Sequence, residues 1–99
     1  MIKHMIIWKL KEDLEDPSKR ALEIKNALEG LVGKIDGLIE MRILTDKFPV
    51  STGDIMMDST FESAMALENY QSHPLHVEIA TGLVRPSVDT RLSFDYEEK

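Results

Sequence analysis

The chain of 99 residues contains no cysteine, which excludes disulfides and thiolate-bound metals. It also lacks a signal-like start, because charged and polar residues interrupt the first apolar stretch at once. A reducing cytosol, and hence a cytoplasmic protein, is therefore expected. No apolar run approaches the roughly 20 residues that a membrane helix needs, so we expect no membrane partner.

Positive charge is also in short supply. The chain has 12 Lys and Arg residues and 18 Asp and Glu residues, which gives a formal net charge of −6. This negative charge argues against a nucleic-acid partner. The carboxylates of Asp54, Asp58, Glu62 and Glu68 have no ligand-like grouping, so no metal is expected. A chain of this length makes one domain, 1–99, and its small core would benefit from an oligomeric interface.

Four stretches of the chain alternate between side chains of different character, and a period of two is typical of β-strands. They are residues 2–10, 37–45, 54–61 and 88–97. In the first stretch, His4 shares a face with Ile6 and Trp8. A histidine on an apolar strand face indicates a lined interior, although a core histidine hydrogen-bonded to a neighbour is the simpler interpretation.

Helices are predicted between these strands. Asp16-Pro17 has the form of an N-cap followed by proline at the first helical position, and apolar residues then recur every three or four positions. This first helix ends in the glycines Gly30 and Gly33. Ser63 can cap a second helix that ends near Ser72.

The stretch 70–77 (YQSHPLHV) carries the residues with the most chemistry. Pro74 lacks an N–H group, so a third helix is expected to begin there and to stop at Pro86. His76 then lies in a first turn, where unpaired N–H groups lower an imidazole pKa and favour the neutral, proton-accepting form. The alternative is that His73 only caps a helix and His76 only packs at a junction.

The predicted order is strand, helix, strand, strand, helix pair, strand. This is the ferredoxin-like βαββαβ arrangement of an α+β protein, with a four-stranded antiparallel sheet. Helices cover one face of such a sheet, and we expect Ile6 and Trp8 on the other face. Because a large exposed apolar patch usually marks an interface, two sheets are predicted to pack face to face in a symmetric homodimer.

Six segments carry a resemblance to a known family. They are residues 2–11 (IKHMIIWKLK), 33–38 (GKIDGL), 60–63 (TFES), 70–77 (YQSHPLHV), 84–86 (VRP) and 94–97 (FDYE). In this order they resemble the stress-responsive dimeric A/B barrel (Dabb) family of the dimeric α+β barrel superfamily. The resemblance spans nearly the whole chain. It implies a ferredoxin-like protomer, a homodimer whose two sheets form a barrel, and no organic cofactor.

Most members of the family have no known reaction, and some plant members are stable stress-induced oligomers or defence proteins. One is a polyketide cyclase, olivetolic acid cyclase, which uses a histidine and a tyrosine for aldol cyclisation. By motif these fall on His76 and Tyr70, a nearby first-strand histidine falls on His4, and the histidine before the proline falls on His73. The resemblance implies a base that removes a proton α to a carbonyl and a phenol that holds the oxyanion.

The lining of the cavity is expected to differ from that cyclase, whose first helix supplies aromatic residues where this chain has aliphatic ones. If Leu92, Phe94 and Tyr96 pack under the helices, the opposite side of the last strand faces the cavity and makes it polar. A small or anionic ligand is then favoured over a lipid-like one. The expected substrate-binding residues are Ile6, Trp8, His73, Arg91 and Ser93.

Three classes of function follow from these observations. The first is a small-molecule binding or stress-response module, a homodimeric barrel with a pocket but no chemistry. The second is a cofactor-independent lyase or cyclase in which His76, Tyr70 and His4 are catalytic. The third is a purely structural stable oligomer, which requires a cavity filled by side chains. An enclosed pocket shared by the three catalytic candidates would separate the first two classes from the third.

Overall fold

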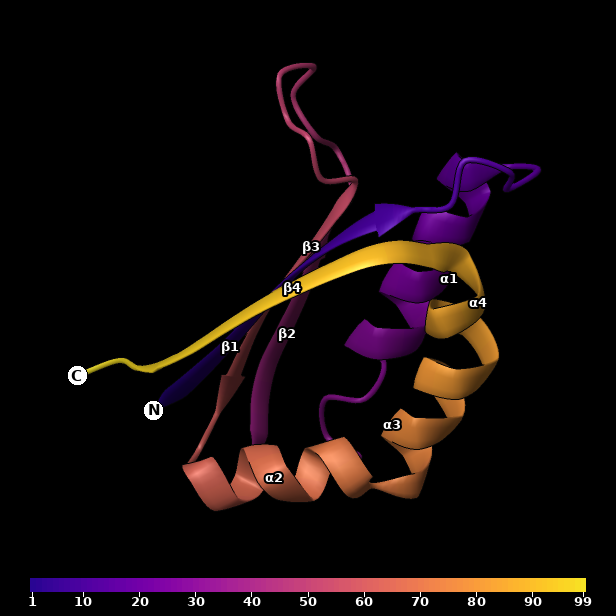
Figure 1. Cartoon of the computed structure of the whole chain (residues 1–99). Helices are drawn as coiled ribbons and strands as arrows, with labels where there is room; N and C mark the ends of the chain where they lie inside the picture. Colours follow the sequence, from indigo (N-terminus) through magenta and orange to yellow (C-terminus); the bar gives the residue numbers. More distant parts are fainter.

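One antiparallel sheet with the order β2-β3-β1-β4 forms the base of the fold. The computed structural model describes residues 1–99, and Figure 1 shows the strands with both termini at the same end of the sheet. The strands are β1 (Ile2–Leu10), β2 (Leu38–Leu44), β3 (Ile55–Phe61) and β4 (Val88–Glu97). These bounds confirm the four predicted strands to within a residue.

The helical segments lie together on one side of the sheet and pack against its buried face (Figure 1). They are α1 (Pro17–Glu29), α2 (Ala64–Ser72), α3 (Pro74–Ile79), the π-helical turn η1 (Ala80–Val84) and α4 (Arg85–Ser87). The element order and the antiparallel sheet confirm the predicted ferredoxin-like α+β fold.

Side-chain caps set the helix starts where the sequence predicted them. Asp16 accepts a hydrogen bond from the N–H of Lys19 at 3.1 Å, and Ser63 accepts one from Ala66 at 3.1 Å. Each cap satisfies an N–H group that has no partner inside the helix. The local sequence therefore determines where α1 and α2 begin.

The end of the last helical run differs from the prediction. Pro86 was expected to stop the helix, but the run continues through η1 to Ser87. The N–H of Arg85 donates to the carbonyl of Ala80, five residues back, so the turn before the proline is widened. A wider turn accommodates a residue that cannot donate a hydrogen bond and whose ring crowds the preceding turn.

The prediction of which sheet face the helices cover was wrong. Ile6 and Trp8 are each only 4% exposed and belong to the core under the helices, not to the open face. Leu92 and Phe94 are instead about 70% exposed. Arg91 is the cross-strand partner of Trp8, and cross-strand partners point to the same face of the sheet. Arg91 therefore lies on the side that the helices cover, whereas the sequence predicted it on the uncovered side.

The uncovered side, which we call the free sheet face, is built from cross-strand rows. Its apolar row runs across all four strands and contains Leu44, Met56, Ile7 and Leu92. In the next row Phe94 and Met5 lie beside an ion pair between Asp58 and Arg42 at 3.5 Å. Apolar and charged side chains therefore share this face.

We expect the two sides of α1 to respond differently to truncation. Ile24 is fully buried, whereas Leu22 is 52% exposed. Ile24→Ala leaves a cavity and should lower the free energy of unfolding by about 2–5 kcal/mol. Leu22→Ala, the matched control, should change it by less than about 0.5 kcal/mol. Chemical denaturation at a fixed protein concentration measures both, and equal losses would contradict this packing of α1.

Candidate functional site

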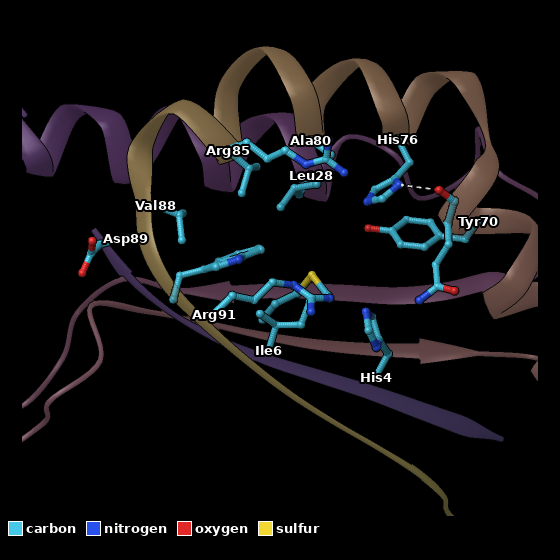
Figure 2. A pocket seen from close by; sticks show the side chains of 14 residues that line it. His4, Ile6, Leu28, Tyr70, His76, Ala80, Arg85, Val88, Asp89 and Arg91 are labelled. Atoms are coloured by element: carbon cyan, nitrogen blue, oxygen red, sulfur yellow. Dashed lines mark hydrogen bonds between the residues drawn. The ribbon is translucent and has the colours of Figure 1, made fainter. Parts of the chain in front are cut away.

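A cavity of about 430 Å³ lies between the sheet and the helical layer. Figure 2 shows its wall, to which β1, β3 and β4 contribute from the sheet and α1, α2, α3, η1 and α4 from the helices. The volume falls within the range of small-molecule sites. The lining residues are His4, Ile6, Trp8, Leu28, Met57, Tyr70, Gln71, His76, Ala80, Val84, Arg85, Val88, Asp89 and Arg91.

Tyr70 and His76 form one wall of the cavity. The break between α2 and α3 at His73 and Pro74 turns the chain so that both rings face inward. Their ring centroids are 4.2 Å apart, and the Tyr70 ring also packs on Phe61 at 4.9 Å. Tyr70 is 1% exposed, so its position is held by packing on both sides.

The hydrogen bond of His76 defines which nitrogen can accept a proton. Its Nδ1 lies 3.4 Å from the carbonyl oxygen of Gln71, a group that can only accept, so Nδ1 carries the hydrogen. In the neutral ring, Nε2 then holds the free lone pair, and Figure 2 shows this nitrogen on the cavity side, near the Tyr70 hydroxyl. His76 is therefore arranged as a base that faces the cavity.

Burial lowers the pKa of His76, and the Gln71 hydrogen bond, which acts in the opposite direction, only partly offsets it. Charge on His4, Arg85 and Arg91 lowers the pKa further. The direction agrees with the sequence prediction, but burial is the largest cause. Near neutral pH the ring is consequently uncharged and able to accept a proton.

Burial has the opposite effect on the acid beside it. The pKa of the Tyr70 phenol is raised well above its usual range by burial, and the positive charge of Arg91 offsets only part of this rise. Tyr70 therefore keeps its proton and can donate a hydrogen bond to an oxygen in the cavity. A neutral base and a protonated phenol are the pair that proton abstraction next to a carbonyl requires.

His4 enters the cavity from the sheet side. Its Nδ1 lies 2.5 Å from Asp95 Oδ1 on the neighbouring strand β4, and Asp95 is its direct cross-strand partner. Phe61 contacts the ring edge-on at 6.2 Å, and His4 is 3% exposed. The carboxylate fixes the ring orientation, so that Nε2 points into the cavity (Figure 2).

The structure brings together most of the residues that the sequence singled out. His4, Tyr70 and His76 line one cavity, and so do three of the expected binding residues, Ile6, Trp8 and Arg91. Two expected binding residues are not in its wall. They are His73 and Ser93, and neither is carried into the candidate site.

His73 has a different use in the structure. Its Nδ1 accepts a hydrogen bond from the N–H of Leu75 at 3.1 Å and so caps α3. This is the simpler alternative that the sequence left open for His73. Sequence reasoning missed Gln71, Arg85 and Asp89 as lining residues. Arg85 lies inside the segment VRP that carried the family resemblance, so a signal was present but gave no role.

Fold and cavity together define a class of protein, a ferredoxin-like α+β protomer with a pocket between sheet and helices. Residues 2–98 match the family model described as the stress responsive A/B barrel domain. The chain therefore belongs to the stress responsive A/B barrel (Dabb) family. A comparison with curated proteins gives no match. None of the helices is long and apolar enough to cross a membrane.

Solved structures of similar proteins share the fold over nearly their whole length. A dimeric ferredoxin-like protein of unknown function from Bacteroides fragilis is 27% identical, with a TM-score of 0.87 and coverage of 98% of this chain and 95% of that one. The Arabidopsis thaliana protein At3g17210 is 26% identical, with a TM-score of 0.83 and coverage of 100% and 96%. A hydroxynitrile lyase from Passiflora edulis is 20% identical, with a TM-score of 0.79 and coverage of 96% and 90%, and shows the fold alone.

The lowered pKa of His76 predicts a pH dependence of stability. The folded chain binds this proton less tightly than the unfolded chain, in which the pKa is about 6.5. The contribution of the neutral ring is complete above pH of about 6.5 and is lost as the pH falls toward the lower folded pKa. We expect an NMR titration of the ring to have its midpoint below about 6.5. When the free energy of unfolding is measured by denaturation at several pH values, His76→Asn should lack the loss of stability that His76 causes as the pH falls. An NMR titration midpoint above about 6.5 would contradict the burial of the His76 ring.

Proposed function

We propose that the cavity binds a small carbonyl compound and transfers a proton at the carbon next to the carbonyl, without a cofactor. The observation that carries this proposal is the contact of a neutral His76 and a protonated Tyr70, 4.2 Å apart by ring centroid, in the wall of a 430 Å³ cavity. A base and a hydrogen-bond donor with separated protonation states are the usual requirement for this chemistry.

The proposed step balances within the cavity. His76 Nε2 takes a proton from the α-carbon, the C–H electrons move into the carbon–carbon bond, and the carbonyl oxygen becomes an enolate oxygen. Tyr70 donates a hydrogen bond to that oxygen, where the negative charge develops. The enolate then takes a proton back or attacks a second carbonyl, as in an aldol-type cyclisation. The reverse carbon–carbon cleavage would be a lyase reaction.

His4 is the second imidazole of the proposed site. Asp95 holds its Nδ1, so its Nε2 is presented to a ligand from the sheet side, opposite His76. A bound carbonyl compound would therefore lie between groups of two different layers. Such convergence from separate elements positions a substrate more strictly than one wall alone.

Two other classes of function remain to be weighed against this one. A purely structural oligomer predicts a cavity filled by side chains, and the open 430 Å³ argues against it. A binding module without chemistry uses the same pocket and is separated only by experiment. The fold does carry a named lyase in Passiflora edulis, although a 20% identity extends no activity to this chain.

Exchange of α-protons with solvent tests the proposed chemistry directly. Hexane-2,5-dione in D2O should lose its α-proton NMR signals faster with the wild-type protein than in buffer. His76→Ala should lower the protein-catalysed rate by about 10²- to 10⁴-fold, because the base is lost. Tyr70→Phe should lower it by about 10²- to 10³-fold, because the enolate loses its donor.

His73→Asn is the matched control for this experiment. It removes the neighbouring imidazole, which is outside the cavity, and keeps an oxygen able to cap α3. Its exchange rate should equal that of the wild type. An α-proton exchange rate in His76→Ala equal to that of the wild type would contradict the proton-transfer proposal. Thermal stabilisation by the ketone with no exchange above buffer would favour the binding module.

We further propose that two copies of the chain associate through the free sheet face. Several similar solved proteins are described as dimeric. Leu92 is 68% and Phe94 70% exposed on this face, and Phe48 and Val50 of the adjoining loop are even more exposed. A contiguous apolar patch of this kind marks an interface, and a twofold axis lets one surface cover itself. The cytosol remains the proposed compartment, since a chain without cysteine needs no oxidising environment.

A charge placed in the apolar row should separate the two copies. Leu92→Asp should shift the sedimentation of the protein from dimer to monomer, because a carboxylate buried without a partner is costly. Leu22→Asp is the matched control, since Leu22 is exposed on α1, on the other side of the molecule. A wild-type protein that sediments as a monomer, or a dimer that survives Leu92→Asp, would contradict the proposed interface.

A further inference from the structure

The chain has four arginines, and they fall into two pairs with different surroundings. Arg20 and Arg42 each make an ion pair, with Glu23 and Asp58 respectively. Arg85 and Arg91 have no carboxylate within 4 Å and no side-chain hydrogen bond. Both of the arginines without partners line the cavity. Both residues are exposed to solvent, so their charged groups are accessible to a ligand that enters the cavity.

The two guanidinium groups approach from opposite layers. Arg85 comes from α4 in the helical layer and Arg91 from β4 in the sheet (Figure 2). Both groups extend along the cavity toward the end where His76 and His4 lie. The positive charges of both arginines lower the pKa of His76, which agrees with guanidinium groups that extend toward this ring. The arginines are therefore within reach of any ligand that contacts the acid–base residues.

We propose that the substrate of this site is a small carbonyl compound with a carboxylate group, and that Arg85 and Arg91 bind the carboxylate from the two sides of the cavity. This inference rests on the proposed proton transfer only for the position of the carbonyl group, beside Tyr70 and His76. Guanidinium groups suit the recognition because their planar N–H donors match the geometry of a carboxylate.

The charges of the wall favour a monoanion. Among its Arg, Lys, Asp and Glu side chains are Arg85, Arg91 and Asp89, which leave one net positive charge. His4 also lines the wall, and its charge is balanced by its partner Asp95. Asp89 stands at the far end of the cavity from His76, so it does not occupy the arginines (Figure 2). A carboxylate neutralises this excess, whereas a phosphate dianion would overcompensate it. The cavity of about 430 Å³ also limits the ligand to a small molecule.

A pair of probes of similar size and shape but different charge tests this inference. 4-Oxopentanoate carries a ketone and a carboxylate, and hexane-2,5-dione replaces the carboxylate by a neutral acetyl group. Trp8, the single tryptophan of the chain, lines the cavity, so its indole N–H signal reports binding of either probe. The wild type should bind 4-oxopentanoate about tenfold to a hundredfold more tightly than the dione, because charged hydrogen bonds are gained.

Substitution of the arginines should remove this preference. Arg85→Gln and Arg91→Gln should each reduce the ratio of the two affinities, and the double variant should bring it close to one. Lys34→Gln is the control, because it removes one positive charge from an exposed position outside the cavity and should keep the wild-type ratio. Circular dichroism of each variant verifies that the fold is intact.

The outcomes separate this inference from the proposed function. A wild type that binds 4-oxopentanoate no more tightly than the dione, or not at all, overturns it. A preference that survives in the double variant also overturns it, as does tighter arginine-dependent binding of inorganic phosphate than of 4-oxopentanoate. Arginine-dependent binding of 4-oxopentanoate without α-proton exchange would support the anion site while contradicting the proton transfer. If both probes exchange α-protons in a His76-dependent manner but bind with equal affinity, the proton transfer is supported and the anion site is contradicted.

Discussion

The alternation of β1 is the constraint on which both surfaces of the sheet depend. β1 is hydrogen-bonded to β3 on one side and to β4 on the other, so its register sets the facing of all its neighbours. Its even residues, His4, Ile6 and Trp8, form the floor of the cavity. Its odd residues lie on the free sheet face, and Ile7 belongs to the apolar row there. A shift of the β1 register by one residue would turn the cavity floor to the free sheet face and the apolar row toward the helices, so neither surface would form.

The cavity gives its polar groups their protonation states. Burial disfavours charge on an acid and on a base alike, so it keeps the proton on Tyr70 and removes it from His76. No metal or neighbouring anion is needed for this separation. The two arginines of the wall strengthen the effect on His76, and they are the groups that we propose to bind a carboxylate of the ligand. Burial therefore sets the two protonation states, whereas the proposed ligand recognition depends on the arginines.

The helical layer is shaped by two prolines that act differently. Pro74 begins α3 where the sequence expects it, and the break before it turns His76 toward Tyr70. Pro86 follows the π-helical turn η1, and the helical run continues through α4 to Ser87, one residue beyond the proline. Arg85 lies at this irregular turn, on the wall of the cavity. Such π-turns inside helices occur frequently at functional sites.

Local patterns in the sequence determined the strands, the helix starts and the fold class, and the family resemblance singled out His4, Tyr70 and His76, which line the cavity. Caps, prolines and a period of two act over a few residues, so they are visible without tertiary structure. Local patterns did not determine which face of β1 the helices cover, because both faces of this strand carry apolar side chains. Only the packing of the helices decided that Ile6 and Trp8 lie inside and that Leu92 and Phe94 lie outside. The same packing placed Arg85 and Arg91 in opposite walls of one cavity, since the two come from different layers whose arrangement no local sequence pattern encodes.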